Sequence, residues 1–221
     1  MTERLCIVGP DGAGKSSLAS RVRESWEHAG HPVELVRVWD ALVPEGSSKE
    51  ALARARKELA CQLPRLSPRE RFELTLEGWR QACARCDPAA LWVVDGFWYK
   101  YAASEMAHGL PRSEVEECLH SIEGLVASPR LVYLEVGAQT AAGRKEHFTD
   151  YECGYQEVGE VAFVEFQTRA RAFLEDLLRP LDPLWIDGRQ PLETLLRHIP
   201  RPRLHGEGRH EKWLGSGESA W

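Results

Sequence analysis

Long apolar runs are missing from this 221-residue sequence, whose uninterrupted apolar stretches cover only a few residues each. A membrane-spanning helix needs about 20 apolar residues, and a secretory signal needs a basic start followed by an apolar stretch. The amino-terminal residues MTERLCIV contain an acidic residue and lead directly into an expected core strand. We therefore expect neither a membrane span nor a signal peptide.

An excess of positive charge is also missing, because 34 acidic residues outnumber 28 lysines and arginines and give a net charge of −6. Proteins that hold a nucleic-acid polymer mainly through its phosphates carry a basic surface. The composition therefore argues against such a polymer as partner, although a local site can still capture a small anion. With 43% hydrophobic residues the chain can bury a substantial core, and we expect one domain over residues 1–199.

A disulfide framework is the third missing feature, since the six cysteines are scattered along the chain. Small secreted domains need such a framework, whereas a chain of this size does not, so we expect reduced thiols and a cytoplasmic protein. Cys83 and Cys86 in CARC have the spacing of one half of a zinc site, but no second pair follows. We favour two thiols one turn apart on a helix over a metal or redox site.

Five short apolar runs alternate with helical patterns. This alternation predicts an α/β fold with a five-stranded parallel sheet and helices on both of its faces. The expected strands are residues 4–8, 33–38, 91–94, 130–136 and 183–186.

Local signals predict where several helices begin and end. Capping boxes place helix starts at Ser67, with Glu70 three residues later, and at Ser113, with Glu116 three residues later. A further helix follows VAFVEF and runs to about Leu178, before Pro180.

The last helix has apolar residues at helical spacing over residues 192–199. From Pro200 onward the sequence is rich in Pro, Gly, Arg and His and shows no sustained period. We expect residues 200–221 to form a tail outside the core, with docking of Trp213 and Trp221 onto the domain or a partner as the alternative.

The stretch GPDGAGKSS, residues 9–17, is the most specific motif in the chain. It follows an apolar strand, precedes an amphipathic helix and fits the pattern G-x-x-x-x-G-K-[ST], in which backbone N–H groups and the helix N-terminus surround a polyphosphate. Lys15 is expected at the terminal phosphates of ATP, and the Ser16 hydroxyl at Mg²⁺. The alternative is an ordinary glycine-rich turn between strand and helix. The expected nucleotide contacts are Gly9, Asp11, Gly12, Ala13, Gly14, Lys15, Ser16 and Ser17.

Four further charged residues, one of them inside this stretch, are candidates for the same chemistry. Asp95 ends an expected buried strand, where it would hold Mg²⁺ or orient the attacking oxygen, unless it caps the next turn. Asp11 would meet a sugar hydroxyl or cap the loop itself. Arg144 and Lys145 lie in a mixed charged and aromatic stretch, residues 141–155, that we expect to act as a mobile lid over ATP. Paired basic residues on a solvated surface are the alternative.

These segments resemble the thymidylate kinase family of nucleoside monophosphate kinases over roughly residues 3–199. The likeness lies in GPDGAGKSS, SPRERFELTLEGWRQ, WVVDGFWYKYAASEMAHG, GRKEHFTDYE and PLWIDGRQPLETLLRHI. It implies a P-loop nucleotide kinase architecture with a lid, Arg80 in contact with the base of the acceptor, Arg144 as the lid arginine, and a homodimer.

The acceptor side departs from the family. Gly96 replaces the arginine that grips the acceptor phosphate, and Leu76 stands in place of the phenylalanine that stacks on thymine. The segment VWDALVPEGSS lacks the Arg-Glu-Pro-Gly run that follows strand two in the family. Lys100 is a candidate substitute for the lost arginine, although it cannot reproduce a bidentate grip.

Three functions remain open at this point. The first is transfer of the ATP γ-phosphate, with Mg²⁺, to a nucleoside monophosphate or nucleotide-like acceptor, with Lys15, Asp95 and Arg144 as catalytic residues. In this reading Ser16 and Asp95 serve the metal, and Asp11, Arg80 and Lys100 face the acceptor. The second is phosphorylation of a nucleoside or another small hydroxyl compound. The third is a regulatory protein that binds a nucleotide without turning it over.

Overall fold

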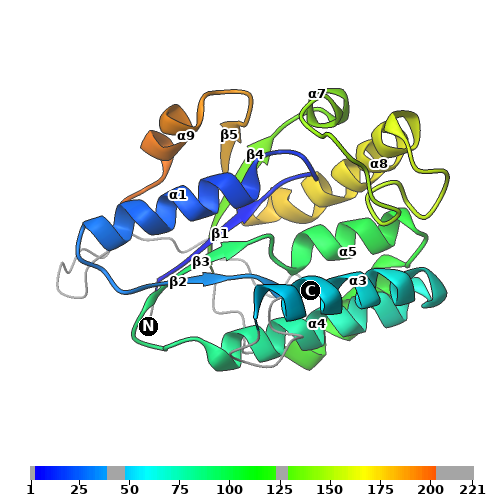
Figure 1. The fold of residues 1–221 in the computed structure, drawn as a ribbon, viewed down its shortest axis with the longest axis horizontal. Coiled ribbons are helices and arrows are strands. Elements are labelled where there is room, and N and C mark those ends of the chain that lie inside the picture. The colour runs from blue at the N-terminus through cyan, green and yellow to red at the C-terminus, as the bar shows by residue number, and fades with distance from the viewer. Residues whose placement is uncertain (1–2, 39–47, 123–128, 203–221) are drawn as a thin grey trace.

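A five-stranded, all-parallel sheet with the strand order β2-β3-β1-β4-β5 forms the centre of the computed structural model (Figure 1). The structure describes residues 3–38, 48–122 and 129–202. The α/β fold class and the five parallel strands are confirmed, and each strand lies within two residues of its expected bounds. The strands are β1 (Arg4–Val8), β2 (Val33–Val36), β3 (Leu91–Asp95), β4 (Arg130–Glu135) and β5 (Leu184–Asp187).

Eight α-helices within the described ranges connect or cover these strands. They are α1 (Lys15–His28), α3 (Lys49–Gln62), α4 (Pro68–Arg85), α5 (Trp98–Ala107), α6 (Arg112–Leu119), α7 (Ala138–Ala142), α8 (Glu160–Leu178) and α9 (Leu192–His198). Short 3₁₀ turns follow three of them: η1 (Leu63–Arg65), η2 (His120–Ile122) and η3 (Arg179–Leu181). None of the helices in the described ranges is both long and apolar enough to cross a membrane.

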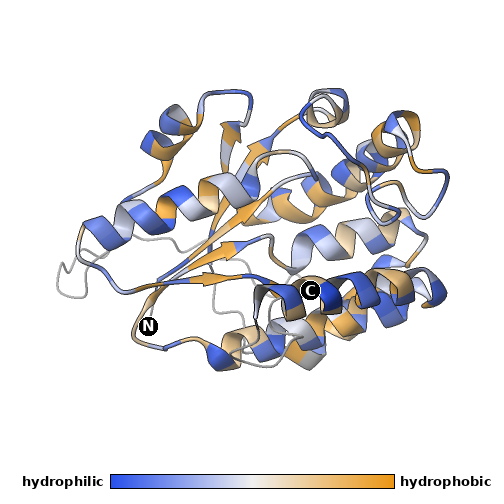
Figure 2. Cartoon of the chain, in the orientation of Figure 1, coloured by the Kyte–Doolittle hydropathy of each residue, from blue (hydrophilic) through white to orange (hydrophobic). Residues whose placement is uncertain are grey.

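Successive side chains of β1 enter two different cores, because neighbouring residues of a strand point to opposite faces of a sheet. Leu5 and Ile7 pack with apolar residues of α1 and α9, whereas Cys6 and Val8 pack with residues of α4, α5 and α8. Figure 1 shows α1 and α9 on one side of the sheet and α4 and α5 on the other. In Figure 2 the strands are mostly hydrophobic, and the helices carry hydrophilic residues on their outer faces. Helices therefore cover both faces of the sheet, as expected.

The parallel register brings the carboxyl ends of the strands to one edge of the sheet. Ile7 of β1 lies opposite Asp95 of β3, and Val8 lies opposite Tyr133 of β4. The loop after β1 and the acidic end of β3 are therefore neighbours, although the sequence separates them widely. Ligands of open α/β sheets bind at this edge.

The capping box at Ser67 is confirmed. Its side chain accepts a hydrogen bond from the Glu70 N–H, the Glu70 side chain binds the Ser67 N–H, and Pro68 occupies the first position of α4. The capping box expected at Ser113 is wrong. Pro111 occupies the N-cap of α6 in an extended conformation and its carbonyl accepts the N–H of Val115, so that Ser113 lies inside the helix.

Cys83 lies on α4 and Cys86 is the residue that caps its C-terminus, as the helical interpretation of CARC predicts. All six cysteines are free thiols. Within the described ranges there is no group of three or more His, Cys, Asp or Glu side chains that could hold a metal ion. Residues 203–221, most of the expected tail with Trp213 and Trp221, lie outside the described residues.

The two capping boxes give a matched stability test. We expect Ser67→Ala to lower the free energy of unfolding by about 1 kcal/mol, because the Glu70 N–H loses its partner at the start of α4. Ser113→Ala should stay within about 0.5 kcal/mol of wild type, since Ser113 caps no helix. Denaturant unfolding of both variants measures the difference, and equal losses would contradict this assignment of the two helix starts.

Candidate phosphate-binding site

The loop of residues 9–17, called the phosphate loop below, holds Gly12 and Gly14 in left-handed backbone conformations that strain other residues. Gly12 has a φ of +79°, and a Cβ there would lie 2.7 Å from the carbonyl oxygen of Ala141. Gly14, with a φ of +94°, is the N-cap of α1, and a Cβ there would meet nothing within 4 Å. As N-cap, Gly14 supplies no side-chain hydrogen bond to the first turn of α1. The N–H groups of that turn are therefore available to an anion.

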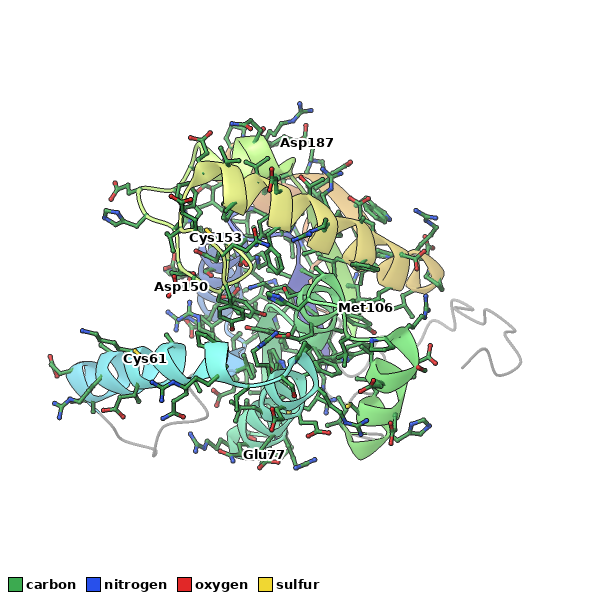
Figure 3. All side chains as sticks on the ribbon, turned by 90° about the vertical axis from the view of Figure 1, so that its right-hand side faces the viewer. Cys61, Glu77, Met106, Asp150, Cys153 and Asp187 are labelled. Atoms are coloured by element: carbon green, nitrogen blue, oxygen red, sulfur yellow. The ribbon has the colours of Figure 1, made fainter. Side chains whose placement is uncertain are left out.

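A cavity of about 1090 Å³ opens beside the phosphate loop. Its wall joins the ends of β2 and β3, parts of α3 and α5, and the lid segment of residues 141–155. In Figure 3, Asp150 and Cys153 of the lid segment lie between α8 and the end of α3 that carries Cys61. Nine of the predicted site residues line the cavity: Asp11, Gly12, Gly14, Lys15, Ser16, Ser17, Asp95, Lys100 and Arg144.

Asp11 holds two lysines next to the phosphate loop. Its Oδ1 lies 2.7 Å from the Lys100 ammonium and 3.8 Å from the Lys15 ammonium. Burial alone would raise the pKa of the Asp11 carboxyl, but attraction to Lys100 and Lys15 outweighs burial and lowers this pKa to about 2. Asp11 therefore stays ionised and pairs with Lys100. The two roles expected from the sequence, a contact with a sugar hydroxyl and a cap of the loop, did not predict this ion pair. Lys100 itself lies on α5.

Lys15 is buried at the start of α1, and its Nζ donates a hydrogen bond to the Pro10 carbonyl at 2.7 Å. Burial lowers the pKa of its ammonium to about 8, while the negative charge of Asp11 works in the opposite direction. Lys15 is therefore protonated and positively charged at neutral pH. Its hydrogen bond to Pro10 holds the ammonium within the phosphate loop.

Asp95 lies at the carboxyl end of β3 with an almost buried side chain, and its Oδ2 accepts a hydrogen bond of 3.2 Å from Arg37 Nε. Arg37 directly follows β2, which ends at Val36, two residues earlier than expected. Gly96 comes next to Asp95 with a φ of +71°, a left-handed conformation that strains any other residue. The backbone at this point therefore disfavours an arginine, whatever space the cavity leaves.

Arg144 and Lys145 of the lid segment both line the cavity but have different partners. The Arg144 guanidinium donates to the carbonyl oxygens of Ala13 at 3.4 Å and Gly188 at 3.0 Å. The Lys145 ammonium forms an ion pair of 2.8 Å with Glu152. Only the Lys145 charge is thus neutralised by a carboxylate in direct contact, and the Arg144 charge lies against the phosphate loop.

Arg80 does not reach the cavity. It lies on the exposed face of α4 and pairs with Glu77. Leu76 is 1% exposed and packs in the core beside the sheet, so it does not line the cavity either. Gly9 and Ala13 belong to the phosphate loop but lie beneath its surface. The segment after β2, residues 39–47, lies outside the described residues.

Two residues with clear structural roles had not been singled out in the sequence. Arg37 is one, through its contact with Asp95. The other is Gln167 of α8, which is 2% exposed. Its Oε1 accepts the Asp11 N–H at 3.1 Å, and its Nε2 donates to the Glu152 carbonyl at 3.0 Å. Gln167 thereby connects the phosphate loop to the lid segment, and only its place on the inner face of α8 could have drawn attention to it.

The residues present fit a magnesium–nucleotide complex. Gly14 leaves open space at the start of α1, the exposed hydroxyl of Ser16 lines the cavity, and Asp95 offers a carboxylate in the same cavity. A hydroxyl and a carboxylate are the oxygen ligands that Mg²⁺ prefers beside phosphates. A scan against models of known protein families finds no match to this chain, and a search of curated proteins finds none either.

The low pKa of Asp11 predicts a specific acid sensitivity. Its folded pKa, about 2, lies below the ordinary value of 3.8, so the stabilisation is present above about pH 4 and is lost as the pH falls toward 2. At one pKa unit per 1.4 kcal/mol the shift corresponds to about 2 kcal/mol. We expect Asp11→Asn to lower the free energy of unfolding by at least this much at pH 7, because Lys100 keeps a buried charge without its partner. Between pH 4 and 2 the free energy of unfolding of this variant should change less than that of wild type.

Asp187→Asn is the matched control. Its carboxyl also has a pKa lowered to about 2, by hydrogen bonds from Arg189, but it is exposed to solvent. The Asp187 effect should therefore be smaller and should fade as salt is added. Denaturant unfolding at pH 7, 4 and 2 measures both variants. Equal effects of the two substitutions would contradict the central position of Asp11.

Proposed function

We propose that this protein is an ATP-dependent phosphotransferase that uses Mg²⁺ to move the γ-phosphate of ATP to a small-molecule acceptor. One observation carries the proposal. The phosphate loop, with its left-handed Gly12 and Gly14 and its buried Lys15, shares one cavity with Asp95 from the neighbouring strand. The α/β fold is consistent with a P-loop kinase architecture.

The residues of the phosphate loop would bind the donor. N–H groups at the start of α1 and the Lys15 ammonium offer positive potential to the phosphates, and the Ser16 hydroxyl would bind the metal. Mg²⁺, when bound, would neutralise charge on the phosphate oxygens. Asp95 would hold the metal or accept a hydrogen bond from the attacking group, with Arg37 fixing its carboxylate.

The lid segment would cover the donor. Because Arg144 already contacts the backbone of the phosphate loop, its guanidinium is the cation best placed to stabilise charge on the transferred group. Aromatic residues Phe148 and Tyr151 line the same wall and would help to exclude water.

The acceptor is a separate question. The resemblance to thymidylate kinases favours a nucleoside monophosphate or a similar nucleotide. Gly96 favours the alternative, a nucleoside or other small hydroxyl compound, because its backbone conformation disfavours a phosphate-binding arginine at that point. A nucleotide-binding regulator without turnover is the third proposal, and the co-located Lys15, Ser16 and Asp95 argue against it.

Three further expectations stay proposals. Six free cysteines favour a cytoplasmic protein. The net charge of −6 disfavours a nucleic-acid polymer as partner. A homodimer is proposed only from the family resemblance, and size-exclusion chromatography with light scattering tests it.

Removal of the Lys15 charge gives the most direct test. We expect Lys15→Ala to remain folded and to lose at least about a hundredfold in turnover, the order of loss for one preorganised electrostatic group. Asp95→Asn should lose a similar factor if Asp95 serves the metal or the attacking group. An ATP-consumption assay with an acceptor panel measures this, and Lys57→Ala on the exposed face of α3 is the control. Near-normal turnover of Lys15→Ala would refute the proposed function.

The two lid cations should differ in effect. Arg144→Ala should lower kcat by roughly 10³ to 10⁵, the range for an arginine that stabilises a transferred phosphoryl group, and should leave ATP affinity nearly unchanged. Lys145→Ala should lose far less, because Glu152 neutralises its charge. Steady-state kinetics and ATP titration measure both. Equal small effects would mean that the pair is a solvated basic surface.

A further inference from the structure

We infer that Gln167 is a positioning residue for phosphoryl transfer, which from α8 sets the distance between the phosphate loop and the lid segment that carries Arg144. The inference rests on the proposed function and adds to it a residue away from the ligand. Gln167 is 2% exposed and is not among the residues that line the cavity, so it would not touch a bound nucleotide. Its effect on the reaction passes through the two segments that it binds.

The phosphate loop is held from α8 and from the lid segment at two consecutive residues. Gln167 Oε1 accepts the Asp11 N–H at 3.1 Å, and its Nε2 lies 3.5 Å from the Asp11 carboxylate. At Gly12 a Cβ would lie 2.7 Å from the carbonyl oxygen of Ala141, so the backbone at the start of the lid segment lies directly against the loop. The separation of loop and lid segment is therefore short and closely defined.

The second hydrogen bond of Gln167 leads into the lid segment. Its Nε2 donates to the Glu152 carbonyl at 3.0 Å. The Glu152 carboxylate in turn accepts hydrogen bonds from Lys145 Nζ at 2.8 Å and from the Thr149 N–H at 3.1 Å. Gln167 thus holds the backbone of the residue whose side chain fixes two other positions of the lid segment.

Arg144 closes these contacts into a ring. It directly precedes Lys145, and its guanidinium donates to the Ala13 carbonyl at 3.4 Å. Ala13 follows Asp11 by two residues, so the contacts begin and end in the phosphate loop. Loss of the Gln167 amide would open the ring at the side opposite Arg144. The members of this contact ring are Asp11, Gln167, Glu152, Lys145, Arg144 and Ala13.

The core holds the Gln167 side chain in place. Phe163 and Phe166 of the same helix are at most 1% exposed. Near the end of the lid segment, a Cβ on Gly154 would lie 2.5 Å from the Phe166 ring, so this part of the segment packs directly against α8. In Figure 3, Cys153 of the lid segment lies close to α8. A side chain on a packed helix positions its partners more precisely than one on a loop.

The proposed chemistry makes this distance important. Arg144 stabilises the transferred phosphoryl group only if its guanidinium reaches that group, and a misplacement of about 1 Å can lower a rate about a hundredfold. Donor binding depends instead on Lys15 and on the N–H groups at the start of α1, which do not contact Gln167. Loss of the amide should therefore lower kcat and leave ATP affinity nearly unchanged.

Replacement of the amide by a thioether of similar length tests the inference. Gln167→Met removes both hydrogen bonds, and we expect kcat to fall by about tenfold to a hundredfold while ATP affinity stays within about twofold. Thr168→Val is the matched control, because Thr168 is exposed on the same helix and its hydroxyl binds only the Val164 carbonyl of that helix. Its kcat should equal that of wild type. ADP release and titration with a non-hydrolysable ATP analogue measure both variants.

A double-mutant cycle separates positioning from general destabilisation. If Gln167 acts through Arg144, then Gln167→Met should change kcat by less than about twofold in an Arg144→Ala background. A merely structural role would lower kcat by the same factor in both backgrounds, and this result would overturn the inference.

Glu152→Gln gives a second way to open the contact ring. It weakens the contact with Lys145 without altering the core, so it tests the inference even if Gln167→Met does not fold. We expect the same pattern, a lower kcat with nearly unchanged ATP affinity and no further effect in the Arg144→Ala background. Equal turnover of this variant and wild type would contradict the ring.

Failure of the inference differs from failure of the proposed function. Wild-type protein that binds the analogue but releases no ADP with any acceptor would refute the proposed function, and the inference would fail with it. Wild-type turnover that Gln167→Met leaves unchanged would overturn the inference alone.

Discussion

Two buried lysines share the carboxylate of Asp11, and the local arrangement of three elements depends on that contact. Lys15 starts α1, Lys100 belongs to α5, and Asp11 lies in the loop between β1 and α1. Two ammonium groups cannot stay buried close together without a negative charge between them. The acidic residue of the loop therefore balances the two lysines, and its pair with Lys100 ties α5 to the loop after β1.

Gln167 adds hydrogen bonds to the backbone of two segments near these charges. Its side-chain amide binds the Asp11 N–H on one side and the Glu152 carbonyl on the other, and Glu152 in turn holds Lys145 and Thr149. A buried amide with partners on two segments fixes both, because each unmade hydrogen bond would leave a desolvated polar group. The phosphate loop and the lid segment thus share one support on α8.

Features that depend on neighbouring residues in the chain were predictable from the sequence. The strands, the phosphate loop and the capping box at Ser67 all follow from local spacing, and the structure places them within two residues. Features that depend on distant partners were not. Arg37 lies 58 residues from Asp95 and Gln167 lies 156 residues from Asp11, so no local pattern could pair them. Arg80 was placed by resemblance alone, and it faces outward. Ser113 shows that even a local signal fails when a competing cap, Pro111, lies two residues earlier.

The contact between Gly12 and Ala141 has an evolutionary consequence. A Cβ at position 12 would lie 2.7 Å from the Ala141 carbonyl, so any larger residue there would displace the end of α7, and with it the start of the lid segment. Because the nearest atom is a backbone oxygen, a different side chain at position 141 would not relieve the clash, and position 12 should stay glycine wherever this backbone is kept. The same clash excludes a cationic side chain at position 12, whereas Arg144 reaches the loop from the lid segment and donates to the Ala13 carbonyl.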